Sequence, residues 1–301
     1  MKKIVILVVV CIILVSIFAM KTNDSDMESA SDIKESVELK EYDSITDFPY
    51  DDMEFLDKSW YEILENEYKK IDFSSTFIIG DVMLEEKSRD KYYKLINEES
   101  PFLYSETQEK LYLSELGKLQ NFPAGTYKIN ELKYYYFDVD GDNVSELGVT
   151  NGVQFRCIFD YDESTDQVVL WKNLYSTWYG IMGTKKIYWN NGGTNKQFVV
   201  LQSNGLEEIK VSFFELNHYD LKNDKEEVVY MVGYPWYVQE DDMEEMKEQA
   251  YCTKDNRYYF RVTKEQYEAL INPYERAEVE SKENIKAVTF TYDEILEKLQ
   301  D

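Results

Sequence analysis

Between residues 55 and 70, apolar side chains recur at every fourth position: Leu56, Trp60, Leu64 and Tyr68. This spacing predicts an amphipathic helix with one face packed on a core. Residues 85–97 are expected to form a second helix. A third is expected after Ser105, because its hydroxyl and Gln108 three residues later match a capping box. The first third of the chain is therefore predicted to be helical.

After Lys133 the pattern changes to short runs rich in Val, Ile, Phe and Tyr, which are typical of β-strands. The runs are residues 134–137, 147–150, 153–159, 167–171, 185–189, 197–202, 209–216, 227–232 and 257–262. Three of the intervening turns contain Asn-Gly, which favours tight hairpins: Asn151-Gly152, Asn191-Gly192-Gly193 and Asn204-Gly205. We expect these runs to form one antiparallel, blade-like β-meander.

Two helices are expected near the C-terminus, each opened by a threonine with Gln or Glu three residues later, at Thr263 and Thr291. Pro273 is expected to end the first, and the second should cover residues 292–299. Residues 240–249 are expected to form an acidic, helical insertion. The fold class predicted is α+β, one unit of residues 48–301 in three parts: a helical part (48–132), a β-meander (133–262) and C-terminal helices (263–301).

The first twenty residues have the pattern of an export signal, with Lys2 and Lys3 ahead of an uncharged stretch from Ile4 to Met20. As a helix this stretch would rise about 25 Å, slightly less than the roughly 30 Å hydrocarbon core. We interpret residues 1–20 as an uncleaved signal anchor that leaves the rest of the chain outside the cytoplasm, joined by an acidic disordered tether of residues 21–47. Secretion after cleavage is the alternative, and lipidation of Cys11 is a further one.

The charge of the chain limits the kinds of partner it can bind, and its cysteine content limits the disulfides it can form. The chain has 301 residues, with 59 acidic against 33 basic side chains and a net charge of -26. The electric field of this negative charge repels nucleic acid and anionic lipid, so we expect no nucleic-acid partner. Outside the cytoplasm, we expect an unknown extracellular or envelope partner. Cys157 and Cys252 either form one disulfide or remain two buried thiols.

One short loop carries the only chemical motif, with carboxylates at its positions 1, 3, 5 and 9: Asp138, Asp140, Asp142 and Glu146. Acids this close repel one another, and a hard cation such as Ca²⁺, which takes six to eight oxygens, relieves that repulsion. The loop can curl around an ion if Asn143 adopts a left-handed conformation, and Val144 could add its backbone carbonyl. Position 12 is Val149, so the loop is not an EF-hand. An acidic turn that binds nothing is the alternative.

The run from Tyr134 to Val149 resembles the aromatic-flanked calcium loop of FG-GAP and calcium-blade proteins. It is especially similar to the single-copy loop in uncharacterised membrane-anchored or lipoprotein-type surface proteins of Gram-positive bacteria, in which a motif similar to residues 262–271 follows. The resemblance implies Ca²⁺ ligation by the four loop carboxylates and brings no known activity. Asn143 replaces the usual glycine and the loop occurs once, so the resemblance does not extend to a complete propeller.

Common catalytic motifs are absent from the sequence. The chain has a single histidine, His218, which we expect in a loop, and neither a Gly-x-Ser-x-Gly elbow nor a glycine-rich phosphate loop. The aromatic clusters at residues 178–180 and 234–237 could bind a sugar or a protein, or could fill the core. We predict a membrane-anchored surface protein, a non-enzymatic binding or structural module stabilised by one Ca²⁺. A secreted hydrolase with a carboxylate pair and an accessory envelope subunit are the alternatives.

Overall fold

The computed structural model describes residues 41–80, 85–104, 106–119, 125–152, 157–174, 179–191, 194–202, 206–235, 249–254 and 257–301. The chain divides into two units, Met1–Glu38 and Leu39–Asp301. The predicted anchor and most of the predicted tether lie outside the described residues, as does most of the predicted helix at 240–249. No helix within these ranges is long and apolar enough to span a membrane.

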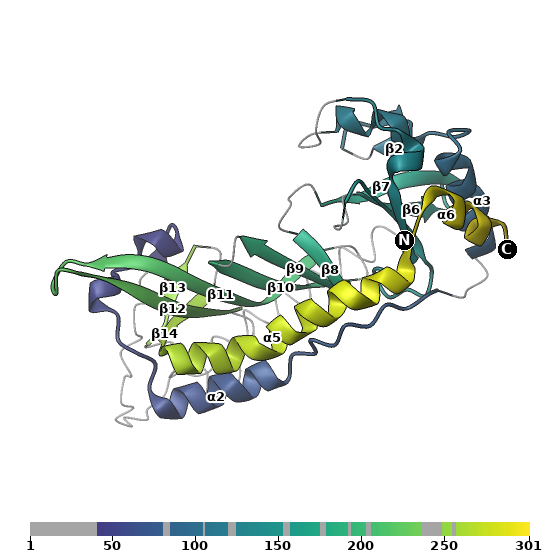
Figure 1. Ribbon diagram of the computed structural model, residues 1–301. Helices are drawn as coiled ribbons and strands as arrows, with labels where there is room; N and C mark the ends of the chain where they lie inside the picture. Colours follow the sequence, from purple (N-terminus) through teal and green to yellow (C-terminus); the bar gives the residue numbers. More distant parts are fainter. Residues whose placement is uncertain are drawn as a thin grey trace, which may run out of the picture. The chain divides into compact units, whose positions relative to one another are not determined.

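The first of two sheets has eight strands, in the order β1-β13-β14-β12-β11-β10-β9-β8 (Figure 1). Its strands are β1 (Glu41–Tyr42), β8 (Tyr179–Gly183), β9 (Lys186–Asn191), β10 (Asn195–Leu201), β11 (Glu207–Asp220), β12 (Lys225–Pro235), β13 (Tyr251–Thr253) and β14 (Arg257–Val262). Strands β8 to β12 follow one another as antiparallel neighbours, whereas β1 pairs with β13 in parallel. Part of the segment expected to be a tether therefore belongs to the folded unit.

The second sheet has seven strands, in the order β15-β4-β5-β6-β7-β2-β3. They are β2 (Phe102–Tyr104), β3 (Glu109–Leu111), β4 (Lys133–Phe137), β5 (Glu146–Thr150), β6 (Cys157–Asp162), β7 (Gln167–Asn173) and β15 (Thr289–Phe290). Strands β4 to β7 form an antiparallel meander, and β2 joins β7 in parallel. The sheet thus combines strands from the first third, the middle and the C-terminal end of the chain.

The predicted α+β fold class is wrong, because the structure is mostly β and is built on two mixed sheets. The runs expected to form one meander are divided between both sheets, since β7 pairs with β2 rather than with β8. The first third is not uniformly helical either. The helix expected after Ser105 is instead strand β3 followed by a 3-10 helix, Leu113–Lys118.

Four α-helices cover the sheets in the part of the chain described: α2 (Lys58–Lys69), α3 (Glu85–Ile96), α5 (Lys264–Asn284) and α6 (Tyr292–Gln300). Five 3-10 helices lie at Ile45–Asp47, Tyr50–Asp52, Leu113–Lys118, Ile129–Glu131 and Ile285–Val288. Helices α2 and α5 lie side by side along one face of the eight-stranded sheet (Figure 1). Their apolar side chains share a core with Phe213 of that sheet. Helices α3 and α6 pack into the core of the other sheet.

Several helix predictions are confirmed. Helix α2 lies within the predicted 55–70, and α3 matches the predicted 85–97. The capping boxes of Thr263 and Thr291 are both present. The predicted stop at Pro273 is wrong, because α5 continues to Asn284. A proline removes one backbone hydrogen bond and clashes with the preceding turn, a cost that burial of Tyr274, Ala277 and Ser281 beyond it offsets.

The two sheets share a third core, to which β4 and β6 contribute Tyr135, Phe137 and Ile158 and the other sheet contributes residues such as Ile187 and Val199. This core fixes the end of β4 where the acidic loop begins. The cores of the described residues lie within Leu39–Asp301, so this unit contains the apolar interior that independent folding requires.

The structure shows where the two downstream cysteines and the single histidine lie. Cys157 lies in β6 and Cys252 in β13, in different sheets and different cores, and these buried thiols form no disulfide. His218 lies in strand β11, not in a loop as predicted, and its Nε2 is 2.6 Å from Oδ1 of Asp51.

Candidate metal centre

The acidic loop connects β4 to β5, an antiparallel pair in which Phe137 lies opposite Glu146. Because the strands are paired up to Phe137 and Glu146, residues 138–145 form a closed turn. This turn brings Glu146, the ninth residue of the motif, back beside Asp138, the first. Two residues of the turn have left-handed backbones: Gly141 with φ 78° and Asn143 with φ 70°. The left-handed conformation predicted for Asn143 is confirmed, and an asparagine tolerates it better than most side chains.

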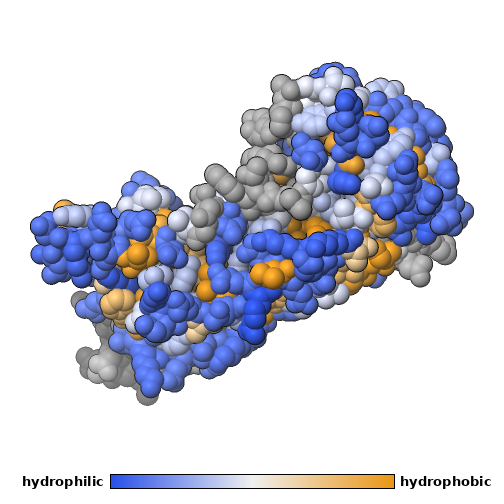
Figure 2. All heavy atoms as spheres, viewed as in Figure 1, coloured by the Kyte–Doolittle hydropathy of each residue, from blue (hydrophilic) through white to orange (hydrophobic). Residues whose placement is uncertain are grey.

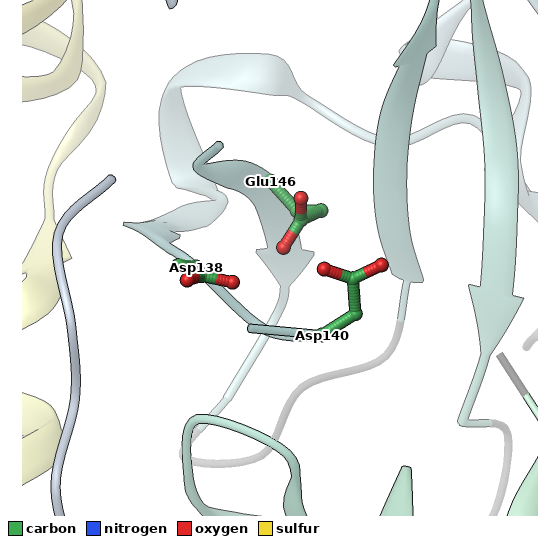
Figure 3. A group of neighbouring side chains, drawn as sticks. All are labelled: Asp138, Asp140 and Glu146. Atoms are coloured by element: carbon green, nitrogen blue, oxygen red, sulfur yellow. The ribbon is translucent and has the colours of Figure 1, made fainter. Parts of the chain in front are cut away.

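Three carboxylates of the predicted set converge: Asp138 and Asp140 from the loop and Glu146 from the start of β5 (Figure 3). One oxygen of each lies within 4.8 Å of the others. Oxygens on opposite sides of a Ca²⁺ ion at about 2.4 Å each would be about 4.8 Å apart, so one ion can bridge this separation. Asp138 and Glu146 are only 1% and 3% exposed, which makes their proximity costly without a counter-charge.

Backbone N–H groups hold these carboxylates in place. Asp138 accepts hydrogen bonds from the N–H of Gly141 and of Asn143, and Glu146 accepts one from the N–H of Val139. Each carboxylate oxygen has two lone pairs, so an oxygen that accepts one hydrogen bond can still coordinate a cation. The loop therefore orients its acids before any ion arrives.

Asp142 lies at the exposed end of the loop. Asp142 is exposed and accepts a hydrogen bond from the N–H of Val144 at 2.7 Å, and its carboxylate is not among the three that converge. Of the four carboxylates predicted as ligands, the structure brings together three and leaves Asp142 outside the group, while the Val144 carbonyl stays a predicted ligand.

Contacts from outside the hairpin support the loop. The backbone N–H of Asp138 donates to the carbonyl of Ile78 at 2.7 Å, and its own carbonyl accepts from the Thr184 hydroxyl at 2.6 Å. Gly80 donates its N–H to the Ser145 hydroxyl, and a Cβ at Gly80 would lie 2.7 Å from the carbonyl oxygen of Asn143. Only glycine permits this approach, so the segment before α3 presses directly on the loop.

Burial and mutual repulsion raise the pKa values of the three converging carboxyl groups. Burial, reinforced by the charge of Asp142, raises the pKa of Asp140 to about 6. Burial also raises the pKa of Asp138, against the opposing hydrogen bonds from the loop backbone, and raises that of Glu146 well above its usual range. Ionisation of these three carboxyl groups is thus less favourable than that of a free acid, and a bound cation would lower their pKa values again.

A further acid, Asp160 in β6, was not predicted as part of the site. Its charge adds to the upward pKa shifts of Asp140 and Glu146, and burial raises its own pKa. Strand β6 lies beside β5, with Phe159 opposite Leu147. Asp160 therefore comes near the loop only through the pairing of β5 with β6, a register that no local sequence signal encodes.

Comparisons with protein families, with curated proteins and with solved structures found no match to this chain. Carboxylate oxygens without sulfur or imidazole ligands are the donor set that hard cations such as Ca²⁺ and Mg²⁺ prefer.

Without a divalent cation, the free energy of unfolding should decrease as the pH rises from about 5 to about 7. A carboxyl group whose folded-state pKa is raised stabilises the fold while it is protonated, and that contribution is lost as the pH passes the folded-state pKa. For Asp140, with its pKa about 6, we expect a loss of about 1 kcal/mol after allowance for solvent screening. Urea denaturation in EDTA at pH 5, 6 and 7 measures it.

The control for this pH dependence is Asp140→Asn, which cannot ionise and should show a correspondingly smaller slope. Acids with lowered pKa, such as Asp72 at about 2, lose their contribution only at lower pH and leave this window clear. Equal slopes in the two proteins would contradict the assignment to Asp140.

Proposed function

We propose that this chain is a membrane-anchored surface protein whose unit Leu39–Asp301 lies outside the cytoplasm and acts as a non-enzymatic binding or structural module stabilised by one Ca²⁺. The observation that carries the ion site is the convergence of Asp138, Asp140 and Glu146 within 4.8 Å, two of them almost fully buried. The partner is an extracellular or envelope component, and the charge of -26 argues against nucleic acid.

An ion at this position would stabilise the fold through both sheets. The loop begins at β4 in the seven-stranded sheet, and Thr184, which follows β8 of the eight-stranded sheet, donates a hydrogen bond to the Asp138 carbonyl. Neutralising the loop acids would thus strengthen a junction between two sheets. Hydrophilic residues cover most of the face seen in Figure 2, which suits a module exposed to solvent.

The alternative of a carboxylate-pair hydrolase is less well supported. Three acids line a cavity of about 700 Å³ beside the acidic loop: Glu67, Asp72 and Asp138. Hydrogen bonding to Lys186 lowers the pKa of Asp72 to about 2. Asp72 is therefore ionised near neutral pH and cannot protonate a leaving group there. Glu67 pairs with Lys70, and both carboxylate oxygens of Asp138 accept hydrogen bonds from its own loop.

The location is tested in Gram-positive protoplasts that produce the full chain. We expect the chain in the membrane fraction and expect protease added to intact protoplasts to degrade the unit Leu39–Asp301. Full protection of this unit until the protoplasts are lysed would contradict the proposed topology. Replacing Ile6 and Leu7 in the N-terminal run by lysine should abolish export, since charges in the apolar stretch prevent insertion.

A further inference from the structure

A cavity of about 700 Å³ lies beside the acidic loop, between the C-terminal end of α2, the turn after β8 and strands β10 to β12. Cavities that hold small molecules typically measure about 300–1,000 Å³. Part of its lining is apolar and comes from Ile71, Phe198, Val200 and Tyr234. Ile78, 43% exposed, adds an accessible apolar side chain to the lining. The cavity therefore has the size and the apolar wall of a ligand site.

Its charge differs from that of the whole chain. Four lysines and three acids line it, whereas acids outnumber basic residues 59 to 33 in the full sequence. The lysines are Lys70, Lys185, Lys186 and Lys210. The lining is thus far richer in lysine than the chain as a whole, and it offers an anion a possible partner in a protein that otherwise repels anions.

Three of these lysines already have acidic partners. Lys70 pairs with Glu67, and Lys210 with Glu208. Lys186 is 13% exposed and donates to the Asp72 carboxylate at 2.7 Å, as well as to both the carbonyl and the hydroxyl oxygen of Ser74. All three donors of the Lys186 ammonium are thus occupied, and its role is to fix the cavity wall.

Lys185 differs from the other three, because its ammonium has no hydrogen bond or ion pair to any residue that the structure describes. Its side chain lies against Gly141, where an added Cβ would meet the Lys185 Cε at 2.0 Å and Nζ at 2.8 Å. The backbone of Lys185 is left-handed, with φ 65°, an unfavourable conformation for a residue with a side chain.

Two backbone hydrogen bonds hold Lys185 in this conformation. The Lys185 N–H donates to the Val139 carbonyl at 2.6 Å, and its carbonyl accepts from the N–H of Leu201 at 2.7 Å. Lys185 is therefore fixed at the wall of the cavity, with an ammonium that pairs with none of the described residues.

We infer that the cavity binds a small organic anion, with its carboxylate or phosphate group on the Lys185 ammonium and its apolar body against Phe198 and Val200. This inference extends the proposed binding module by naming its ligand class, and it does not require the ion site. The anionic group would pair with the Lys185 ammonium, and the apolar body would fill the space between α2 and β10.

The test is a fluorescence titration of the unit Leu39–Asp301 with 8-anilinonaphthalene-1-sulfonate, an aromatic anion that fluoresces in apolar sites. Working in EDTA makes the outcome independent of the proposed Ca²⁺ site. Lys185→Met should weaken binding about tenfold, since a charge-assisted hydrogen bond is lost, whereas Lys185→Arg should stay within about threefold of the wild type. Val200→Phe, which fills the cavity, should weaken binding to a similar extent.

A matched control is Lys110→Met, which removes an exposed lysine of strand β3 in the other sheet and should leave the titration unchanged. Thermal melts confirm that each variant is folded before its titration is compared. If Lys185→Met binds the probe as tightly as the wild type, or if Lys110→Met weakens it equally, the inference is overturned.

Competition identifies the head group. Octanoate or octyl phosphate should displace the probe, and the more effective of the two indicates a carboxylate or a phosphate ligand, while octanol should be far weaker than either. Displacement by octanol as effective as by the anions, or by none of the three compounds, would overturn the inference, because the anionic group would then not be recognised.

Discussion

Asp138→Ala is expected to abolish the stabilisation of the protein by Ca²⁺ and to lower the free energy of unfolding in 2 mM Ca²⁺ by about 2–4 kcal/mol. Cell-surface Ca²⁺ modules bind with dissociation constants of about 0.1–1 mM, and an ion at tenfold excess over its Kd contributes about 1.4 kcal/mol. The remainder comes from the N–H groups of Gly141 and Asn143, which lose their acceptor. Chemical denaturation with and without Ca²⁺ separates the two parts.

The matched control for Asp138→Ala is Asp162→Ala, at the end of β6 in the same sheet. Asp162 also caps a turn, accepting hydrogen bonds from the Ser164 N–H and from the hydroxyls of Ser164 and Thr165, but it is outside the converging carboxylates. Its loss should reduce stability while leaving the Ca²⁺ response intact. A full Ca²⁺ response in Asp138→Ala would show that the ion, if bound, does not use this residue.

Leu64→Ala is expected to lower the free energy of unfolding by about 3 kcal/mol and the Tm by about 10 °C, because it opens a cavity under α2. Leu64 is fully buried in the core that α2 shares with α5 and the eight-stranded sheet. The Ca²⁺-dependent part of the stability should be unchanged, since the acidic loop lies in the other sheet. Thermal and urea denaturation measure both quantities.

The control for Leu64→Ala is the same substitution at Leu221, which is 78% exposed in the turn between β11 and β12. It should change the unfolding free energy by no more than about 0.5 kcal/mol. Similar effects at the two positions would contradict the packing of α2 on the sheet.

Local signals predicted individual elements well and their assembly poorly. The four-residue spacing of Trp60, Leu64 and Tyr68 placed α2, and the capping box of Thr263 placed the start of α5. Pairing between distant segments has no comparable signal. Strand β2 beside β7, and β15 beside β4, join residues far apart in the sequence, and such contacts decided the fold class.

The candidate site shows the same limit. Carboxylate spacing identified the loop, and the need for a left-handed residue identified Asn143, because both lie within one short turn. The roles of Gly80, Thr184 and Asp160 depend on how other segments meet the hairpin. Pro273 shows the converse case, where tertiary packing overrides a local stop signal and the helix continues.

The central claim is that the loop between β4 and β5 binds Ca²⁺, and the most direct measurement is a thermal melt of the unit Leu39–Asp301 in EDTA, in 2 mM Mg²⁺ and in 2 mM Ca²⁺. We expect the Tm in Ca²⁺ to exceed that in EDTA by about 3–6 °C, and we expect Mg²⁺ to have a smaller effect because it requires a tighter octahedral site. Three coincident melts would contradict the claim and reduce the loop to an acidic turn.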